Sequence, residues 1–163
     1  MKQSLRSDEL KKILVIFTAW RLFLFIPLFL SEFFLKFREG YNYTSPSYWS
    51  SISHFLLAPW ANFDGIYYLI LASRGYTVDS AGFFPLFPLL INLVSSIFGS
   101  VQAFDLRQYF IALILASVFF ASALLFIHKL VRFDYDSNIA MLTIIFILVF
   151  PTSFFFVSIY SES

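Results

Sequence analysis

Long apolar stretches separated by short polar segments dominate this chain. Three stretches, residues 13–30, 109–130 and 139–157, come close to or reach the 20 or so residues that a helix needs to cross the hydrocarbon core of a bilayer. The pattern therefore predicts three transmembrane helices joined by one long and one short polar segment. It corresponds to an all-α, polytopic membrane protein.

Composition supports this class and limits the chemistry. Hydrophobic residues make up 60% of the chain and charged residues 13%, against about 45–50% and about 25% in soluble domains. The absence of cysteine excludes disulfides and thiolate chemistry. No Gly-rich phosphate loop and no basic stripe for nucleic acid is evident, and a net charge of +1 argues neither for nor against an acidic partner.

Cations set the expected orientation of the first helix. Lys2, Arg6, Lys11 and Lys12 precede it, so the positive-inside rule predicts a cytoplasmic N-terminus. A cleaved signal peptide is the alternative, but the residues that follow the apolar run, Leu30-Ser31-Glu32, lack a small-x-small cleavage pattern.

A fourth apolar run leaves two topologies open. Residues 83–98 are short for a span and carry Pro85 and Pro88 in their first turns. If the run spans, Lys129 and Arg132 lie outside the cytoplasm. If it is interfacial or re-entrant, they lie inside with the N-terminal cations, which the positive-inside rule favours.

The choice of topology decides whether two acids can share a site. With three spans, the loop 31–108 and the end of the chain both lie outside the cytoplasm, so Asp64 and Glu162 stand on one side of the membrane. With four spans they stand on opposite sides, and a shared site is excluded.

Within the external loop, residues 64–74 have the pattern of a short interfacial helix that ends at Gly75. The residues that recur at helical spacing are Ile66, Leu69, Ile70 and Ser73, while Tyr67, Tyr68 and Leu71 fall on other faces. We expect a second interfacial helix over 83–98.

The polar residues of this region have structural as well as functional interpretations. Asp64 suits a helix N-cap as well as a catalytic acid, and Arg74 in a last turn complements the helix dipole. The run Phe83-Phe84-Pro85 would also serve as an aromatic anchor at the headgroups. Arg21, inside the first span, is best explained by snorkelling or by pairing with another helix.

Three pieces of sequence, in order, resemble one family. They are FDGIYYLILASRGY from Phe63, FFPLFPLL from Phe83, and FPTSFFFVSIYSES from Phe150. Together they look like the PIG-V-like mannosyltransferases, the second mannosyltransferases of GPI-anchor synthesis and their prokaryotic relatives, in the GT-C glycosyltransferase class. One departure is Phe63, because the family usually has Trp before the acid and phenylalanine lacks the indole N–H donor.

The resemblance covers the chain from about Trp60 onward and implies a larger enzyme. Such enzymes have many more spans, so we expect residues 1–163 to be the N-terminal part of one transmembrane domain, a GT-C-type helical bundle that needs its remaining helices. This part alone is not expected to be fully active.

The resemblance also implies a reaction. A sugar, here mannose, passes from a polyprenyl-phosphate donor to a hydroxyl of a lipid or glycan acceptor outside the cytoplasm. Asp64 matches the family's first-loop acid and would be the general base. Arg74 would hold the departing phosphate, and Glu162 would be a second acid that orients the acceptor or joins a metal site.

The remaining site residues that the resemblance implies would bind substrate. With Arg74 they are Phe63, Tyr76, Phe84, Pro85 and Tyr160. No cluster of acids and histidines has metal-ligand spacing, so these residues predict no metal. They predict no other cofactor either, and the cofactor stays unknown. The location would be the plasma membrane of a prokaryote or the endoplasmic reticulum of a eukaryote.

Two alternatives stay open. A small transporter or a structural membrane protein would show the same hydropathy, although matched broken helices in two halves are not evident. A GT-C enzyme with another sugar or acceptor would share the same motifs.

Overall fold

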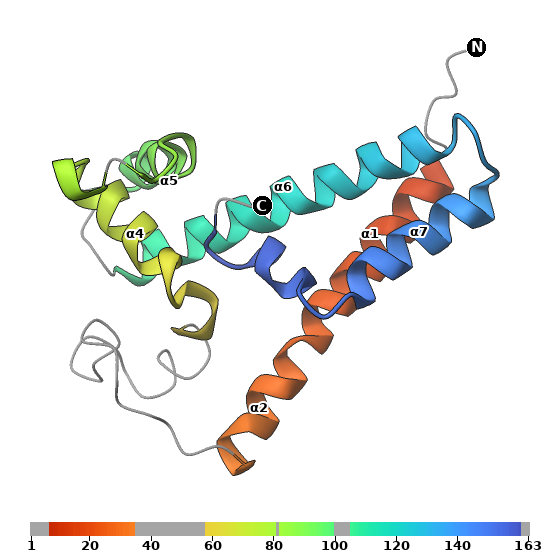
Figure 1. Ribbon diagram of the computed structural model, residues 1–163, viewed down its shortest axis with the longest axis horizontal. Coiled ribbons are helices and arrows are strands. Elements are labelled where there is room, and N and C mark those ends of the chain that lie inside the picture. Colours follow the sequence, from red (N-terminus) through yellow and green to blue (C-terminus); the bar gives the residue numbers. More distant parts are fainter. Residues whose placement is uncertain (1–6, 35–57, 81, 100–104, 161–163) are drawn as a thin grey trace. The chain divides into compact units, whose positions relative to one another are not determined.

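The computed structural model describes residues 7–34, 58–80, 82–99 and 105–160, and every regular element assigned there is a helix (Figure 1). Two helical stretches, Ser7–Ser31 and Leu106–Val131, are long and apolar enough to cross a membrane, by length and composition. The all-helical prediction is therefore confirmed for the described residues, and membrane association has the support of two such stretches.

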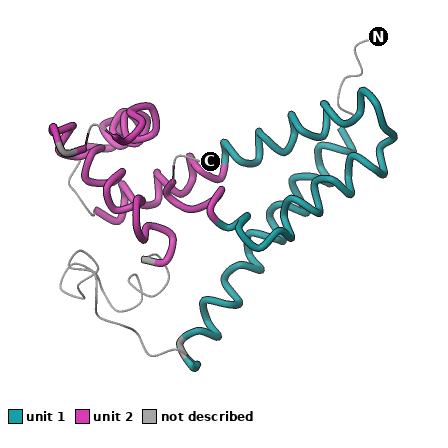
Figure 2. The backbone as a smooth tube through the Cα atoms, in the orientation of Figure 1, with its two compact units in different colours: residues 1–35, 118–154 teal, residues 36–117, 155–163 magenta. Residues whose placement is uncertain are grey.

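The chain forms two compact units (Figure 2). Unit 1 comprises residues 1–35 and 118–154, and unit 2 comprises residues 36–117 and 155–163. The boundary crosses helix α6 (Leu106–Val131) between Ser117 and Val118.

In unit 1, the first apolar stretch folds as two consecutive helices, α1 (Ser7–Phe23) and α2 (Phe25–Phe34). Pro27 explains the interruption at Leu24, because proline has no N–H to donate to the carbonyl of Phe23, four residues earlier. Only Ile13 and Phe17 of α1 are buried. Most other apolar side chains of these two helices are exposed or half-exposed, as expected for a surface that lipid covers.

Helix α7 (Ser137–Val149) packs against α1. Asp136 caps its start, with the carboxylate accepting from the amides of Asn138 at 2.8 Å and Ile139 at 2.9 Å. Glu9, near the start of α1, accepts a hydrogen bond from the Ser137 hydroxyl at 2.6 Å. The α6–α7 turn and the start of α1 therefore lie at the same end of unit 1.

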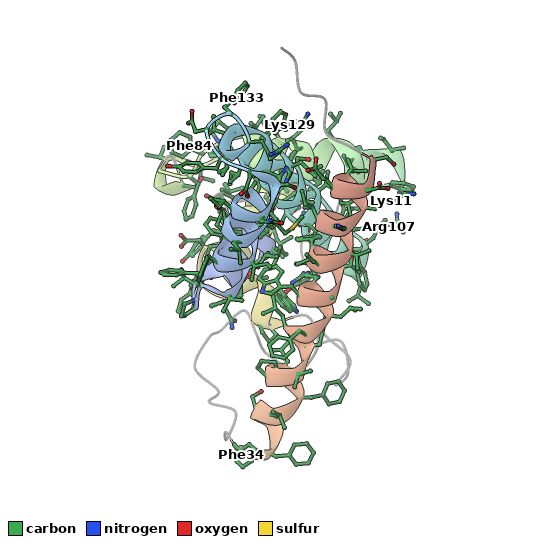
Figure 3. The ribbon with its side chains drawn as sticks, turned by 90° about the vertical axis from the view of Figure 1, so that its right-hand side faces the viewer. Lys11, Phe34, Phe84, Arg107, Lys129 and Phe133 are labelled. Atoms are coloured by element: carbon green, nitrogen blue, oxygen red, sulfur yellow. The ribbon has the colours of Figure 1, made fainter. Side chains whose placement is uncertain are left out.

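Charged side chains mark that end. Arg132 approaches Glu9 at 3.9 Å. Figure 3 shows Lys11 and Lys129 toward this end of the unit and Phe34 at the opposite end. In between, Phe17, Trp20 and Phe120 join α1 to α6, with ring centroids 5.9–6.1 Å apart.

The third predicted span, 139–157, is only partly a regular helix. α7 ends at Val149, and Phe150 has an extended backbone with φ −60° and ψ 133°. Pro151 accounts for this, because a residue before proline is pushed out of the helical region. Ser153–Val157 then forms the 3₁₀ helix η4.

In unit 2, α4 (Asp64–Arg74) packs against α5 (Leu86–Ile97) and against the 3₁₀ helix η2 (Ala58–Ala61). The bounds of α4 equal those expected from the sequence. Its buried face is wider than expected, since Tyr68 and Leu71 are 3% and 6% exposed. They are buried because α4 has neighbours on more than one side.

Helix α5 is shorter than the apolar run 83–98 that contains it. It begins at Leu86 because Pro85 holds the cap position with φ −77°. Its buried residues include Phe87 and Ile91, while Leu89 and Leu93 are 59% and 62% exposed. Twelve residues give a helix about 18 Å long, well below the roughly 30 Å of a hydrocarbon core.

Candidate functional site

All the site residues expected from the sequence belong to unit 2. Glu162 lies outside the described residues. The others fall into two groups, one at the start of α4 and one at or beyond its end.

Asp64 is the first residue of α4 and is exposed to solvent. Phe63 holds the cap position, and no side chain there makes a capping hydrogen bond. The N-cap interpretation of Asp64 is therefore wrong, because the acid lies one residue inside the helix. Its carboxylate makes no hydrogen bond or ion pair in the part of the chain that the structure describes.

Phe63 has an unusual backbone. Its φ of 55° and ψ of −119° lie in a region that glycine adopts readily and other residues rarely do. The Gly65 amide donates to the carbonyl of Asn62 at 3.2 Å, closing a tight turn over Asn62–Gly65. Asp64 sits within this turn, so the turn geometry aims its carboxylate.

The segment Ser158–Tyr160 returns to this turn from the other end of the chain. The amide of Ile159 donates to the carbonyl of Trp60 at 2.7 Å, and the hydroxyl of Tyr160 donates to the carbonyl of Asn62 at 2.6 Å. Tyr160 is only 7% exposed, and its ring meets the edge of Phe155 at 5.3 Å between centroids. Two of the three motif pieces are thus in direct contact.

Gly65 makes that contact close. A Cβ on Gly65 would lie 2.8 Å from the carbonyl oxygen of Ile159, nearer than Cβ atoms come to other atoms. The obstructing atom belongs to the backbone, so it cannot rotate away. Position 65 therefore requires glycine as long as Ile159 is in place.

Arg74 is the last residue of α4, at the opposite end from Asp64. Ten residue steps at about 1.5 Å each separate their backbones by about 15 Å. The structure therefore does not bring this cation to the acid. Gly75 follows with φ 79°, and its amide donates to Leu71 at 3.0 Å, which ends the helix as expected.

Aromatic residues gather alongside and beyond α4. The Tyr76 hydroxyl donates to the carbonyl of Phe83 at 3.2 Å, and the ring of Phe83 stacks on Tyr67 and meets Tyr68 edge-on at 5.3 and 5.4 Å. Desolvation by burial, with the Tyr68 phenol nearby, raises the pKa of Tyr76.

Phe84 and Pro85 follow in the chain and are exposed. Phe84, with 76% of its surface accessible, is open to a ligand or to lipid. Neither residue lies in the Asn62–Gly65 turn.

Several polar residues that the sequence did not single out hold α4 in place. The Gln108 amide donates to the carbonyl of Leu69 at 2.9 Å, and the Asn92 amide donates to that of Ala72 at 2.6 Å. Each is a lone amide side chain within an apolar helix, which is the signal that would have identified it. Among the described residues, the buried oxygen Oε1 of Gln108 and the Ser95 hydroxyl have no hydrogen-bond partner.

No group of three or more His, Cys, Asp or Glu side chains that would hold a metal ion occurs within residues 7–34, 58–80, 82–99 and 105–160. The carboxylate of Asp64 is thus the acid that this turn offers to a ligand. The arrangement would allow a carboxylate to accept a proton from a bound hydroxyl group.

Comparisons of this chain with protein-family models, with curated proteins and with solved structures find no match.

Proposed function

We propose that this chain belongs to a membrane glycosyltransferase that moves a sugar from a polyprenyl-phosphate donor to an acceptor hydroxyl on the extracytoplasmic side, with mannose as the sugar. The observation that carries this proposal is the contact between the Asp64 turn and the Ile159–Tyr160 segment. These belong to two motifs that resemble one glycosyltransferase family, and they come together although 98 positions separate Asn62 from Tyr160.

The proposed reaction needs one base. The acceptor oxygen attacks the anomeric carbon of the donor, a new glycosidic bond forms, and the bond from that carbon to the phosphate oxygen breaks. The polyprenyl phosphate leaves with the electron pair. The proton of the acceptor hydroxyl passes to the carboxylate of Asp64, which is exposed and ready to accept it, and the configuration at the anomeric carbon inverts.

Arg74 is a weaker candidate for holding the phosphate. The phosphate and the attacking hydroxyl both meet at the anomeric carbon, whereas Arg74 and Asp64 lie at opposite ends of α4. With the described residues as they stand, Arg74, Tyr76, Phe84 and Pro85 fit better as contacts of more distant parts of a substrate, such as the lipid chain or its surroundings.

One observation supports the three-span topology that the proposal needs. The contact of Ser137 with Glu9 pairs the α6–α7 turn with the start of α1, so Arg132 and Lys11 share one end of unit 1. With the N-terminus in the cytoplasm, the loop that carries Asp64 would then be outside.

Transfer of radiolabel in lipid vesicles tests the proposal. The full-length protein is incubated with a short-chain polyprenyl phosphate carrying tritiated mannose and with octyl α-mannoside as acceptor. We expect label in the acceptor, and a loss of about 10²–10⁴-fold for Asp64→Asn. Asp134→Asn is the matched control, because Asp134 is exposed in unit 1 and remote in sequence from the turn.

Two results would overturn the proposal. One is full activity of Asp64→Asn, and the other is no transfer by the unmodified protein with mannose or other hexose donors. Passage of a small solute into the vesicles without transfer would instead favour the transporter.

A further inference from the structure

We infer that Gly65 and Tyr160 are positioning residues that aim the Asp64 carboxylate, so that Tyr160 acts on the turn and not on the substrate. The inference rests on the proposed function and adds the means by which a segment near the end of this chain controls the geometry of the acid. Here we call the contacts of Ile159 and Tyr160 with the Trp60–Gly65 segment the clasp.

The first argument concerns the hydroxyl of Tyr160. It donates to the Asn62 carbonyl at 2.6 Å, which already accepts the Gly65 amide at 3.2 Å. A carbonyl oxygen has two lone pairs, so these two donors fill its capacity. A phenol has a single proton to donate, and here that proton holds the backbone that carries Asp64.

The second argument concerns the strain at Phe63. A non-glycine residue at φ 55° and ψ −119° is costly and persists only where its surroundings hold it. The hydrogen bond from the Gly65 amide to the Asn62 carbonyl closes the turn across Phe63. Tyr160 and Ile159 donate to the carbonyls of Asn62 and Trp60, which precede Phe63 in the chain. The clasp therefore supplies the contacts that keep the turn in this conformation.

The third argument concerns the fit at Gly65. The Ile159 carbonyl oxygen lies only 2.8 Å from the position that a Cβ on residue 65 would take. A methyl group there would push Ile159 off the turn, and the neighbouring Tyr160 hydroxyl would move with it. One methyl group at position 65 and one missing hydroxyl at position 160 thus disturb the same contact from its two sides.

Kinetics of the full-length protein test the inference with the octyl α-mannoside assay. We expect Tyr160→Phe to lower kcat about tenfold and Gly65→Ala about a hundredfold, with KM for the acceptor little changed, because a displaced carboxylate impairs the reaction and not the binding. The matched controls are Tyr135→Phe, an exposed tyrosine of unit 1, and Gly82→Ala, where a Cβ meets no atom within 4 Å.

Hydrogen–deuterium exchange gives a measurement that does not depend on activity. In Tyr160→Phe, a protein that differs by one oxygen atom, we expect faster exchange in the peptide that contains the Gly65 amide and unchanged exchange in α7. Tyr135→Phe should leave the Gly65 peptide as it is.

The outcomes separate the inference from the proposed function. A rise in KM with kcat unchanged in Tyr160→Phe would make Tyr160 a substrate contact and overturn the inference alone. Unchanged kinetics or unchanged exchange at Gly65 would do the same. An inactive unmodified protein would overturn the proposed function, and the positioning role with it.

Discussion

The two units use polar side chains for different purposes. In unit 1, Ser137 and Arg132 link the α6–α7 turn to Glu9 near the start of α1. Asp136 caps the start of its own helix, α7. In unit 2, side chains from three distant parts of the chain reach main-chain carbonyls along α4 and its preceding turn. The donors are Tyr160 to Asn62, Gln108 to Leu69, and Asn92 to Ala72.

This difference between the units indicates which part of the backbone is held most firmly. Links between helix ends set how helices meet but leave the backbone within each helix unchanged. Hydrogen bonds to the carbonyls of one short helix fix that helix and the strained residue before it. Unit 2 therefore holds α4 from several directions, as a precisely aimed acid would require.

The largest expected difference between the units is the side of the membrane from which a thiol reagent can label each of them. Because the chain has no cysteine, Lys129→Cys in unit 1 and Val78→Cys in unit 2 are unique thiols at exposed positions. We expect a membrane-impermeant maleimide to label residue 78 from outside the cell and residue 129 only after the membrane is opened. Labelling of both from one side would contradict the three-span topology.

The next effect compares two acids at the starts of helices. Asp136 caps α7 with two hydrogen bonds, whereas Asp64 caps nothing. Asp136→Ala should lower the free energy of unfolding by about 1 kcal/mol and leave transfer intact. Asp64→Ala should lower the transfer rate about 10²–10⁴-fold. It should change the free energy of unfolding by no more than about 0.5 kcal/mol. Denaturant titration in mixed micelles measures the free energy of unfolding of both variants. A stability loss in Asp64→Ala as large as that in Asp136→Ala would show that Asp64 stabilises the start of α4.

A smaller effect is expected from the Ser137 hydroxyl of unit 1. It donates to the carboxylate of Glu9 at 2.6 Å in a partly buried position. Ser137→Ala should lower the free energy of unfolding by about 1 kcal/mol, since it leaves a charged acceptor without this donor. An unchanged unfolding midpoint would show that the contact with Glu9 does not hold α7 to α1.

The smallest effect is expected from the buried serine of unit 2. Ser95 is 3% exposed, and its hydroxyl has no hydrogen-bond partner in the part of the chain that the structure describes. Ser95→Ala removes an unsatisfied polar atom, so stability should stay within about 0.5 kcal/mol or rise. A loss similar to that of Ser137→Ala would indicate that the Ser95 hydroxyl has a partner in the folded protein, such as a bound water molecule.

Local features of the fold could be predicted from the sequence. The limits of α4 follow from a change of pattern at Asp64 and a glycine at position 75, and both act within a few residues. The effect of Pro151 is also local, because it moves the preceding residue out of the helical region and α7 ends at Val149. Pro27 interrupts the first helix for the same reason, and the apolar pattern conceals it.

The contacts that build the candidate site could not be predicted in this way. Hydrophobic periodicity carries no information on which carbonyl a tyrosine 98 positions away will meet, and a glycine beside an acid does not reveal that Ile159 lies against it. The resemblance linked the two motifs and assigned Tyr160 to substrate binding, but it did not predict the hydrogen bond from Tyr160 to the Asn62 carbonyl. Arg74 was assigned to the phosphate because it is near Asp64 in sequence. The helix between them places the two residues at opposite ends of α4.

Chemical rescue tests the central claim most directly, namely that the Asp64 carboxylate accepts the proton of the acceptor. The transfer rate of Asp64→Ala is measured with rising formate, a carboxylate small enough to enter the space left by the side chain. We predict a loss of about 10²–10⁴-fold without formate and a concentration-dependent recovery with it, while the unmodified protein does not respond. A transfer rate of Asp64→Ala equal to that of the unmodified protein, with or without formate, would contradict the claim.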